Sequence, residues 1–298
     1  MTRRRVGKQW TGLMSLFDGI DLISGVVLFA AAVCGGAVNA VAGGGTLLTF
    51  PTLLWASQPE IIANATSTVA LWPGALSSFW TYRSELKGNW RQIGLLALPS
   101  FAGGVLGAVL LLDTSNATFA ALVPYLLLLA TGLFMVQRPL SAWLQRRQAN
   151  ASGATSELAE GKVDGGPEPH TTWRRWIGVA LFQFLVGVYG GYFGAGIGIL
   201  MLAAFGYLGF RNIHQMNAIK NLNAMCINGI AGALFITQSL VDWRLAALMA
   251  TGAVVGGVAG AGTARRIGQD RVRRIIIFIG LALSAWLLVR QFGLLGRL

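Results

Sequence analysis

Two glycine-rich stretches decide the fold, "GGAVNAVAGGGTLL" at residues 35–48 and "GVYGGYFGAGIGIL" at residues 187–200. Both lie inside long apolar runs, where each glycine destabilises a helix by about 1 kcal/mol relative to alanine. We therefore expect each stretch to break a helix at membrane depth. A short apolar helix should follow each break, "TLLTFPTLLW" from residue 46 or "IGILMLAAF" from residue 197.

The composition around these stretches is that of a membrane protein. Of 298 residues, 54% are hydrophobic and 11% are charged, whereas soluble domains carry about 25% charged residues. Apolar runs of about twenty residues, the length that crosses a bilayer, recur along the whole chain, which excludes a lone signal peptide. We expect an all-α integral membrane protein of 8–10 transmembrane helices. Its apolar segments are 22–41, 45–56, 61–82, 91–112, 117–136, 175–193, 195–209, 213–237, 244–263 and 273–296.

The formal net charge of +12 comes from short basic segments between these apolar runs. This distribution is the positive-inside pattern of a multi-pass protein of the bacterial inner membrane, and it argues against nucleic-acid binding. The segments expected on the cytoplasmic side carry Arg83, Lys87 and Arg91, then Arg138, Arg146, Arg147, Arg174 and Arg175, and finally Arg265, Arg266, Arg271, Arg273 and Arg274. The turns around Asp113 and Asp242 should face outward.

The sequence predicts two transmembrane repeats, at 22–136 and 175–298, joined by a hydrophilic cytoplasmic linker at 137–174. Residues 1–21 form an expected interfacial segment. Ten full crossings would place the basic amino end outside, whereas a re-entrant first hairpin would place it inside. The sequence leaves these two topologies open.

Matches between the two halves keep a nearly constant offset. Trp90 and Trp243 differ by 243 − 90 = 153, and Asn64 and Asn217 by 217 − 64 = 153. The glycine breaks align at an offset of 151, which implies a two-residue insertion between the breaks and the later matches. Glycines 103, 104 and 107 match 256, 257 and 260 at 153, and we interpret Gly103, Gly107, Gly256 and Gly260 as packing residues. Because each half holds five segments, an odd number, we expect the repeat to be inverted.

The breaks supply the first candidate site. A helix that starts inside the membrane points free N–H groups and the positive end of its dipole into the bundle, an arrangement that suits an anion. Close helix packing is the alternative explanation for the same glycines. The candidates are Gly43, Gly44 and Gly45 in the first half, Gly194, Gly196 and Gly198 in the second, and the flanking Asn39 and Tyr189.

Two polar stripes supply the rest of the site. Spacings of i, i+3 and i+4 place each trio on one helical face, and the cost of polar groups in hydrocarbon turns that face inward. The stripes are Asn64, Ser67 and Thr68 in the first half and Asn217, Lys220 and Asn221 in the second.

Lys220 is the basic residue inside an apolar segment, and every acidic residue stands in a loop or near a segment end. An anionic substrate is therefore a natural partner for its ammonium group. A lysine held neutral by its apolar surroundings, or one that snorkels to the interface, remains an alternative. Cys34 and Cys226 lack metal-ligand spacing, and we expect no cofactor, metal or catalytic residue.

Three stretches carry a family resemblance, "NAVAGGGTLLTFPTLL" (39–54), "NATSTVALWPGALSSFWTYR" (64–83) and "NWRQI" (89–93). They resemble the sulfite exporter TauE/SafE family of bacterial membrane proteins. The resemblance runs from about Gly35 to the end of the chain. It implies secondary transport of a small sulfur-containing anion such as sulfite, a sulfonate or sulfoacetate. The family motif falls on Gly43, Gly44, Gly45, Pro51, Thr66 and Ser67, and the second half carries Ile219 and Lys220 at the last two positions.

We therefore expect a non-enzymatic transporter that works by alternating access. The alternatives are transport of another small anion, and a membrane-embedded enzyme or assembly factor. Coupling to protons or sodium is open, and the GxxxG faces permit a homodimer within the lipid.

Overall fold

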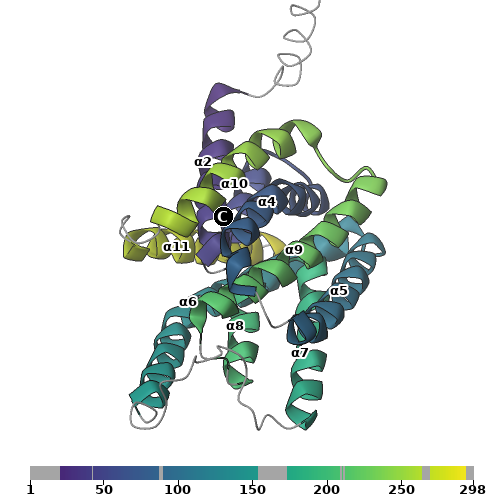
Figure 1. Cartoon of the computed structure of the whole chain (residues 1–298). Helices are drawn as coiled ribbons and strands as arrows, with labels where there is room; N and C mark the ends of the chain where they lie inside the picture. Colours follow the sequence, from purple (N-terminus) through teal and green to yellow (C-terminus); the bar gives the residue numbers. More distant parts are fainter. Residues whose placement is uncertain are drawn as a thin grey trace, which may run out of the picture.

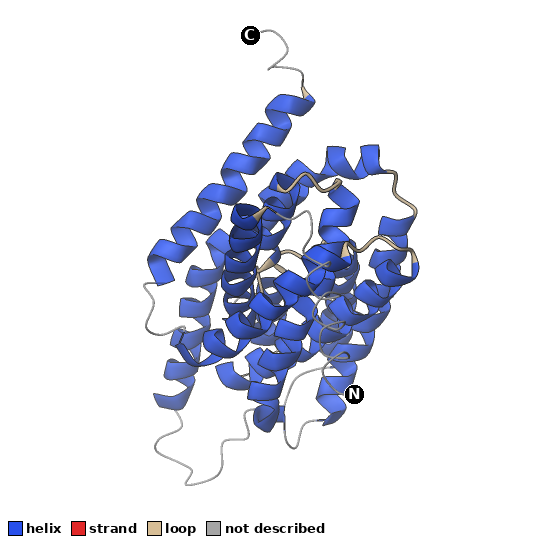
Figure 2. Cartoon of the chain, turned by 90° about the horizontal axis from the view of Figure 1, so that it is seen from above, coloured by secondary structure: helices blue, strands red, loops and turns tan. Residues whose placement is uncertain are grey.

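The computed structural model describes residues 21–41, 43–86, 90–153, 173–208, 210, 212–263 and 269–292. Within these ranges the chain forms helices and no strands (Figure 2). Each of the ten predicted apolar segments corresponds to one α-helix. These are α2 (Leu22–Val41), α3 (Thr46–Trp55), α4 (Glu60–Tyr82), α5 (Trp90–Leu112), α6 (Asn116–Gly153), α7 (Trp173–Tyr192), α8 (Ile197–Tyr207), α9 (Ile213–Thr237), α10 (Trp243–Thr263) and α11 (Gln269–Gln291), with a 3₁₀ turn η1 (Arg83–Leu86) after α4.

Five of these helices, α2, α5, α6, α9 and α11, are long and apolar enough to cross a membrane. In contrast, α3 has 10 residues and α8 has 11. At 1.5 Å per residue each is about 15 Å long, half of the hydrocarbon thickness of about 30 Å. The two predicted breaks and the short helices after them are confirmed, and so is the all-helical membrane fold.

Helices far apart in the sequence form the main contacts of the bundle (Figure 1). In the part of the chain that the structure covers, α5 packs along α7 and α2 along α10, while α5 also contacts α9 and α4 contacts α10. The helices α4 and α9 cross at the centre, and α6 packs on α11. If α2 to α6 are set against α7 to α11 in order, each of these contacts has its counterpart. The two halves are thus interleaved and share one core.

Glycine allows the two most extensive interfaces to form. A Cβ atom at Gly107 of α5 would overlap the carbonyl oxygen of Val188 in α7, and one at Gly256 of α10 would overlap that of Val33 in α2. A Cβ at Gly103 would likewise meet the backbone of α7. The packing role predicted for these three glycines is confirmed, whereas the surroundings of Gly260 lie outside the described residues.

The helix α6 extends past the end of the apolar segment predicted at 117–136 and continues to Gly153. Its sequence here, "QRPLSAWLQRRQAN", is polar but rich in good helix formers such as Leu, Gln, Arg and Ala. Polarity ends a membrane span without ending the helix, so the apolar span agrees with the prediction while residues 137–153 of the predicted linker are helical. Residues 154–172 of the predicted linker and residues 1–20 of the interfacial segment predicted at 1–21 lie outside the described residues.

Substitution of Gly107 tests the backbone contact between α5 and α7. We expect Gly107→Ala to lower the free energy of unfolding by about 1–3 kcal/mol, because the new methyl group has no space. Gly94→Ala on the same helix is the matched control, since a Cβ there meets nothing within 4 Å and alanine favours the helix. Thermal unfolding in detergent measures both, and equal effects would contradict the close approach.

Candidate functional site

The two helix breaks touch each other at the centre of the bundle. The backbone N–H of Gly196 donates to the carbonyl of Gly43 over 3.0 Å. Gly43 and Gly194, which the offset of 151 pairs, have φ of +78° and +81°, in the left-handed region that other residues avoid. A Cβ at Gly43 would lie 2.7 Å from the Cα of Gly198. The glycines therefore serve as breaks and as packing residues at once.

Each break is also held by the polar helix of the other half. The Asn64 side chain in α4 donates from Nδ2 to the carbonyl of Tyr192, the last residue of α7, over 3.0 Å. Lys220 in α9 donates from Nζ to the carbonyl of Ala40, near the end of α2, over 3.3 Å. Carbonyls in the last turn of a helix have no partner within that helix. The predicted stripes and breaks thus meet across the two halves.

Lys220 is buried completely, with 1% of its surface exposed. The carboxylates whose side chains the structure describes stand at helix ends or beside them, at Asp21, Glu60, Asp113 and Asp242. The recorded partner of the ammonium group is instead the Ala40 carbonyl, at the negative end of the α2 dipole. A carbonyl is neutral and does not balance the charge of a protonated lysine.

The short helices α3 and α8 begin without a side-chain cap. Gly45 precedes α3 and Gly196 precedes α8, and neither start is capped by a side-chain hydrogen bond. The first N–H groups of a helix lack intrahelical acceptors, and the positive end of its dipole favours an anion there. Asn39 is half-buried with its Cβ close to Gly45, and Gly44 packs under the ring of Phe134.

Three of the predicted hydroxyl groups already have partners. Ser67 Oγ and Thr49 Oγ1 are 2.6 Å apart and share a hydrogen bond. Thr68 donates to the carbonyl of Asn64 in its own helix over 2.9 Å, and the Tyr189 hydroxyl donates to the carbonyl of Ala195 over 2.8 Å. Thr68 therefore supports α4, and Tyr189 supports the second break.

The predicted amides keep hydrogen-bonding capacity. Asn64 Oδ1, Asn217 Oδ1 and Asn221 Nδ2 are buried without a partner. A buried polar atom left without a hydrogen bond costs about 1–3 kcal/mol. A polar ligand or water among these amides would recover that energy, so the stripes remain candidates for binding.

The sequence analysis missed three polar residues near these helices and named Thr66 only as a position of the family motif. Thr49 bonds to Ser67, and Thr66 Oγ1 accepts the backbone N–H of Asp242 over 3.0 Å. Gln183 and Asn223 are fully buried, and both polar atoms of each lack partners. Gln183 is the single polar residue of an apolar stretch, a signal that would have found it, whereas Thr49 and Asn223 have other polar residues close by in the sequence.

Aromatic rings enclose the second break. Phe193 lies edge-on to Phe50 of α3, with ring centroids 5.4 Å apart, and it also contacts Phe119 of α6. Tyr192 packs on Phe119 and its hydroxyl lies 3.3 Å from Thr114 Oγ1, in the turn between α5 and α6. The break is therefore shielded from the turn around Asp113.

A helical bundle with membrane-length apolar spans, two helix breaks in contact and a buried lysine bonded to the end of one broken helix is the architecture of a membrane transporter. The model of the family described as "Sulfite exporter TauE/SafE" matches residues 28–287. The chain belongs to this family, and the protein is a membrane-embedded transporter of the TauE/SafE type.

Curated relatives agree with this class over nearly their whole length. A "Probable membrane transporter protein" of Haemophilus influenzae is 28% identical over 92% of this chain and 97% of its own. "Probable membrane transporter protein ORF9" of a Sinorhizobium species is 27% identical, over 88% and 91%. "Probable membrane transporter protein YfcA" of Escherichia coli K12 is 26% identical, over 94% and 96%. No solved structure gives a significant match.

The bond between Thr49 and Ser67 can be tested with a double-mutant cycle. We expect Thr49→Val to lower the free energy of unfolding by about 1–3 kcal/mol, because it leaves the buried Ser67 hydroxyl without its partner. Ser67→Ala should cost less, because the Thr49 hydroxyl keeps its hydrogen bond to the carbonyl of Gly45 over 3.3 Å. The double variant should lose less than the sum of the two. Unfolding in detergent measures all three, and strictly additive losses would show that the two hydroxyls do not interact.

Proposed function

We propose that the protein carries a small sulfur-containing anion across the bacterial inner membrane by alternating access. The anion binds where the two helix breaks meet, between the starts of α3 and α8. The observation that carries the proposal is the fully buried Lys220, whose recorded partner is a neutral carbonyl.

The donors around this point suit an oxyanion. Lys220 supplies the countercharge, the starts of α3 and α8 supply the positive ends of their dipoles, and Asn221 offers an Nδ2 group without a partner. The N–H groups of Leu47, Leu48 and Ile199 already donate to the carbonyls of Gly44, Gly45 and Gly196. Hydrogen bonds to a charged group contribute about 1.5–3 kcal/mol each. Several such bonds can replace part of the hydration shell that a small anion loses in the bundle.

The choice of a sulfur-containing anion depends on the family description, which names a sulfite exporter. The curated relatives are named only as probable membrane transporters. An ammonium group and amides bind a small carboxylate or another oxyanion by the same chemistry. The alternative substrate is therefore another small anion.

Alternating access requires two halves that exchange roles, and we infer an inverted repeat. The Trp72 indole in α4 donates to the carbonyl of Met225 in α9 over 3.1 Å, and these residues differ by the repeat offset, 225 − 72 = 153. If a twofold axis relates the two halves, a residue close to that axis is expected to contact its own counterpart. In Figure 1, α2 lies at the upper end of the molecule and α7 at the lower end, which supports opposite entry.

Flux in proteoliposomes tests the substrate and the role of Lys220. We expect uptake of sulfite or a small sulfonate above that of chloride or a carboxylate, and a 10- to 100-fold loss in Lys220→Met, since about 1.5–3 kcal/mol of charged hydrogen bonding disappears. Imposed proton and sodium gradients in the same vesicles identify the coupling ion.

The control is Lys220→Arg, which keeps the charge, together with size-exclusion profiles that verify folding of each variant. If Lys220→Met folds and transports normally, Lys220 only caps α2 and the proposed anion site is wrong. If a carboxylate is transported and sulfur anions are not, the site stands and the substrate class changes.

Equivalent loops in the two halves test the inversion. Arg83 follows α4 and Gln238 follows α9, and both side chains are exposed. In a background without native cysteines, we expect a membrane-impermeant maleimide applied outside whole cells to label Gln238→Cys and not Arg83→Cys. In inside-out vesicles the labelling should reverse. Labelling of both variants from one side would exclude an inverted repeat.

A further inference from the structure

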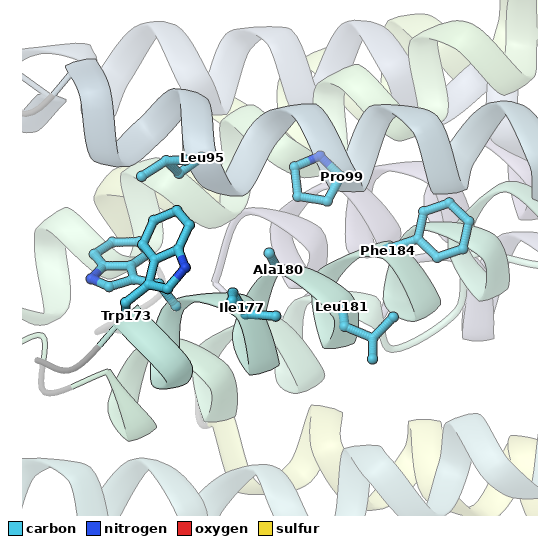
Figure 3. A pocket seen from close by; sticks show the side chains of 8 residues that line it. Leu95, Pro99, Trp173, Ile177, Ala180, Leu181 and Phe184 are labelled. Carbon is cyan, nitrogen blue, oxygen red and sulfur yellow. The ribbon is translucent and has the colours of Figure 1, made fainter.

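An apolar groove lies between α5 and α7, away from the helix breaks (Figure 3). Its volume is about 440 Å³, and its open side exposes Ile177 and Leu181 on the lipid-facing surface of α7. The lining is aliphatic and aromatic throughout, so this groove does not suit a small anion. It is formed by Leu95 and Pro99 of α5 and by Trp173, Trp176, Ile177, Ala180, Leu181 and Phe184 of α7.

The corresponding place in the first half is filled. Gly252 of α10 matches Pro99, since 252 − 99 = 153, and Phe29 of α2 matches Ala180, since 180 − 29 = 151. A Cβ built on Gly252 would lie 2.8 Å from the Phe29 carbonyl and 3.3 Å from its ring, so the phenylalanine packs directly on the glycine. In the second half a small alanine faces a proline, and the space between them stays open.

One end of the groove carries aromatic and basic residues. Trp173 and Arg174 are exposed at the start of α7, and Arg174 precedes Ile177 of the lining by one helical turn. Tryptophan and arginine favour the interface between hydrocarbon and headgroups. The first-half counterpart of Arg174 is Ile23, since 174 − 151 = 23. Arg175 points elsewhere, 5.9 Å from the Tyr207 ring centroid.

The geometry points to a phospholipid site: the groove holds one acyl chain of an anionic phospholipid, and Arg174 binds its headgroup. An acyl chain matches an apolar groove that opens toward the bilayer. A guanidinium at the interfacial end distinguishes an anionic from a zwitterionic headgroup. The site occurs in one half because the other half fills the groove with Phe29 and lacks the arginine.

Photo-crosslinking tests the site in the full-length protein. Phosphatidylglycerol and phosphatidylcholine with the same diazirine-bearing acyl chain are reconstituted separately, and the labelled peptides are mapped by mass spectrometry. We expect labelling between residues 173 and 184 to be about fivefold higher with phosphatidylglycerol, the factor that corresponds to about 1 kcal/mol for one basic residue near anionic lipid.

Two variants separate the headgroup from the acyl chain. Arg174→Gln should abolish the preference for phosphatidylglycerol but keep labelling of the groove. Pro99→Gly with Ala180→Phe reproduces the arrangement of the first half and should remove labelling with both lipids. Arg290→Gln is the matched control, because Arg290 lies 5.7 Å from the Trp286 ring centroid on α11, and it should change neither.

Equal labelling of the groove by the two lipids in the unmodified protein would overturn the headgroup assignment. Labelling no stronger in the groove than on the other lipid-facing helices would overturn the site itself.

Discussion

A peptide group inside a membrane has no water to bind, and this constraint governs the centre of the molecule. A continuous helix satisfies it alone, but α2 and α7 both end at glycine breaks within the bundle. The free carbonyls of each half are bonded by a side chain of the other half, Asn64 on Tyr192 and Lys220 on Ala40. The breaks also bond to each other through Gly196 and Gly43.

Similar backbones in the two halves carry different side chains at the centre. Ser67 and Thr49 form a neutral hydroxyl pair in the first half, and the offsets place Lys220 and Leu200 at these positions in the second. The ionisable group therefore comes from Lys220 of the second half. Its Nζ contacts the end of α2 in the first half. A bound anion would lie beside a residue that also holds a helix end. In the proposed function, binding and the geometry of that break would be linked at one side chain.

The sequence predicted the membrane class, the ten segments, the breaks at Gly43 and Gly194 and the packing role of Gly107, because apolar length and glycine position are local properties. It could not predict which carbonyl Lys220 contacts, since this depends on how α2 and α9 cross. Hydropathy located the apolar span of α6 but not the polar continuation of the helix to Gly153, because helix propensity does not require apolar residues. The pair of Thr49 and Ser67 and the groove at Ala180 depend on neighbours brought together by the interleaving of the halves.

The reciprocal bonding of the breaks has a consequence for biogenesis. Ala40 leaves the ribosome long before Lys220, so the first half enters the bilayer with its α2 carbonyl still lacking the partner that the finished protein provides. Tyr192 meets its donor Asn64 as soon as α7 arrives, because Asn64 is already in place. Of the two reciprocal contacts, the one that closes the earlier break is therefore the later to form.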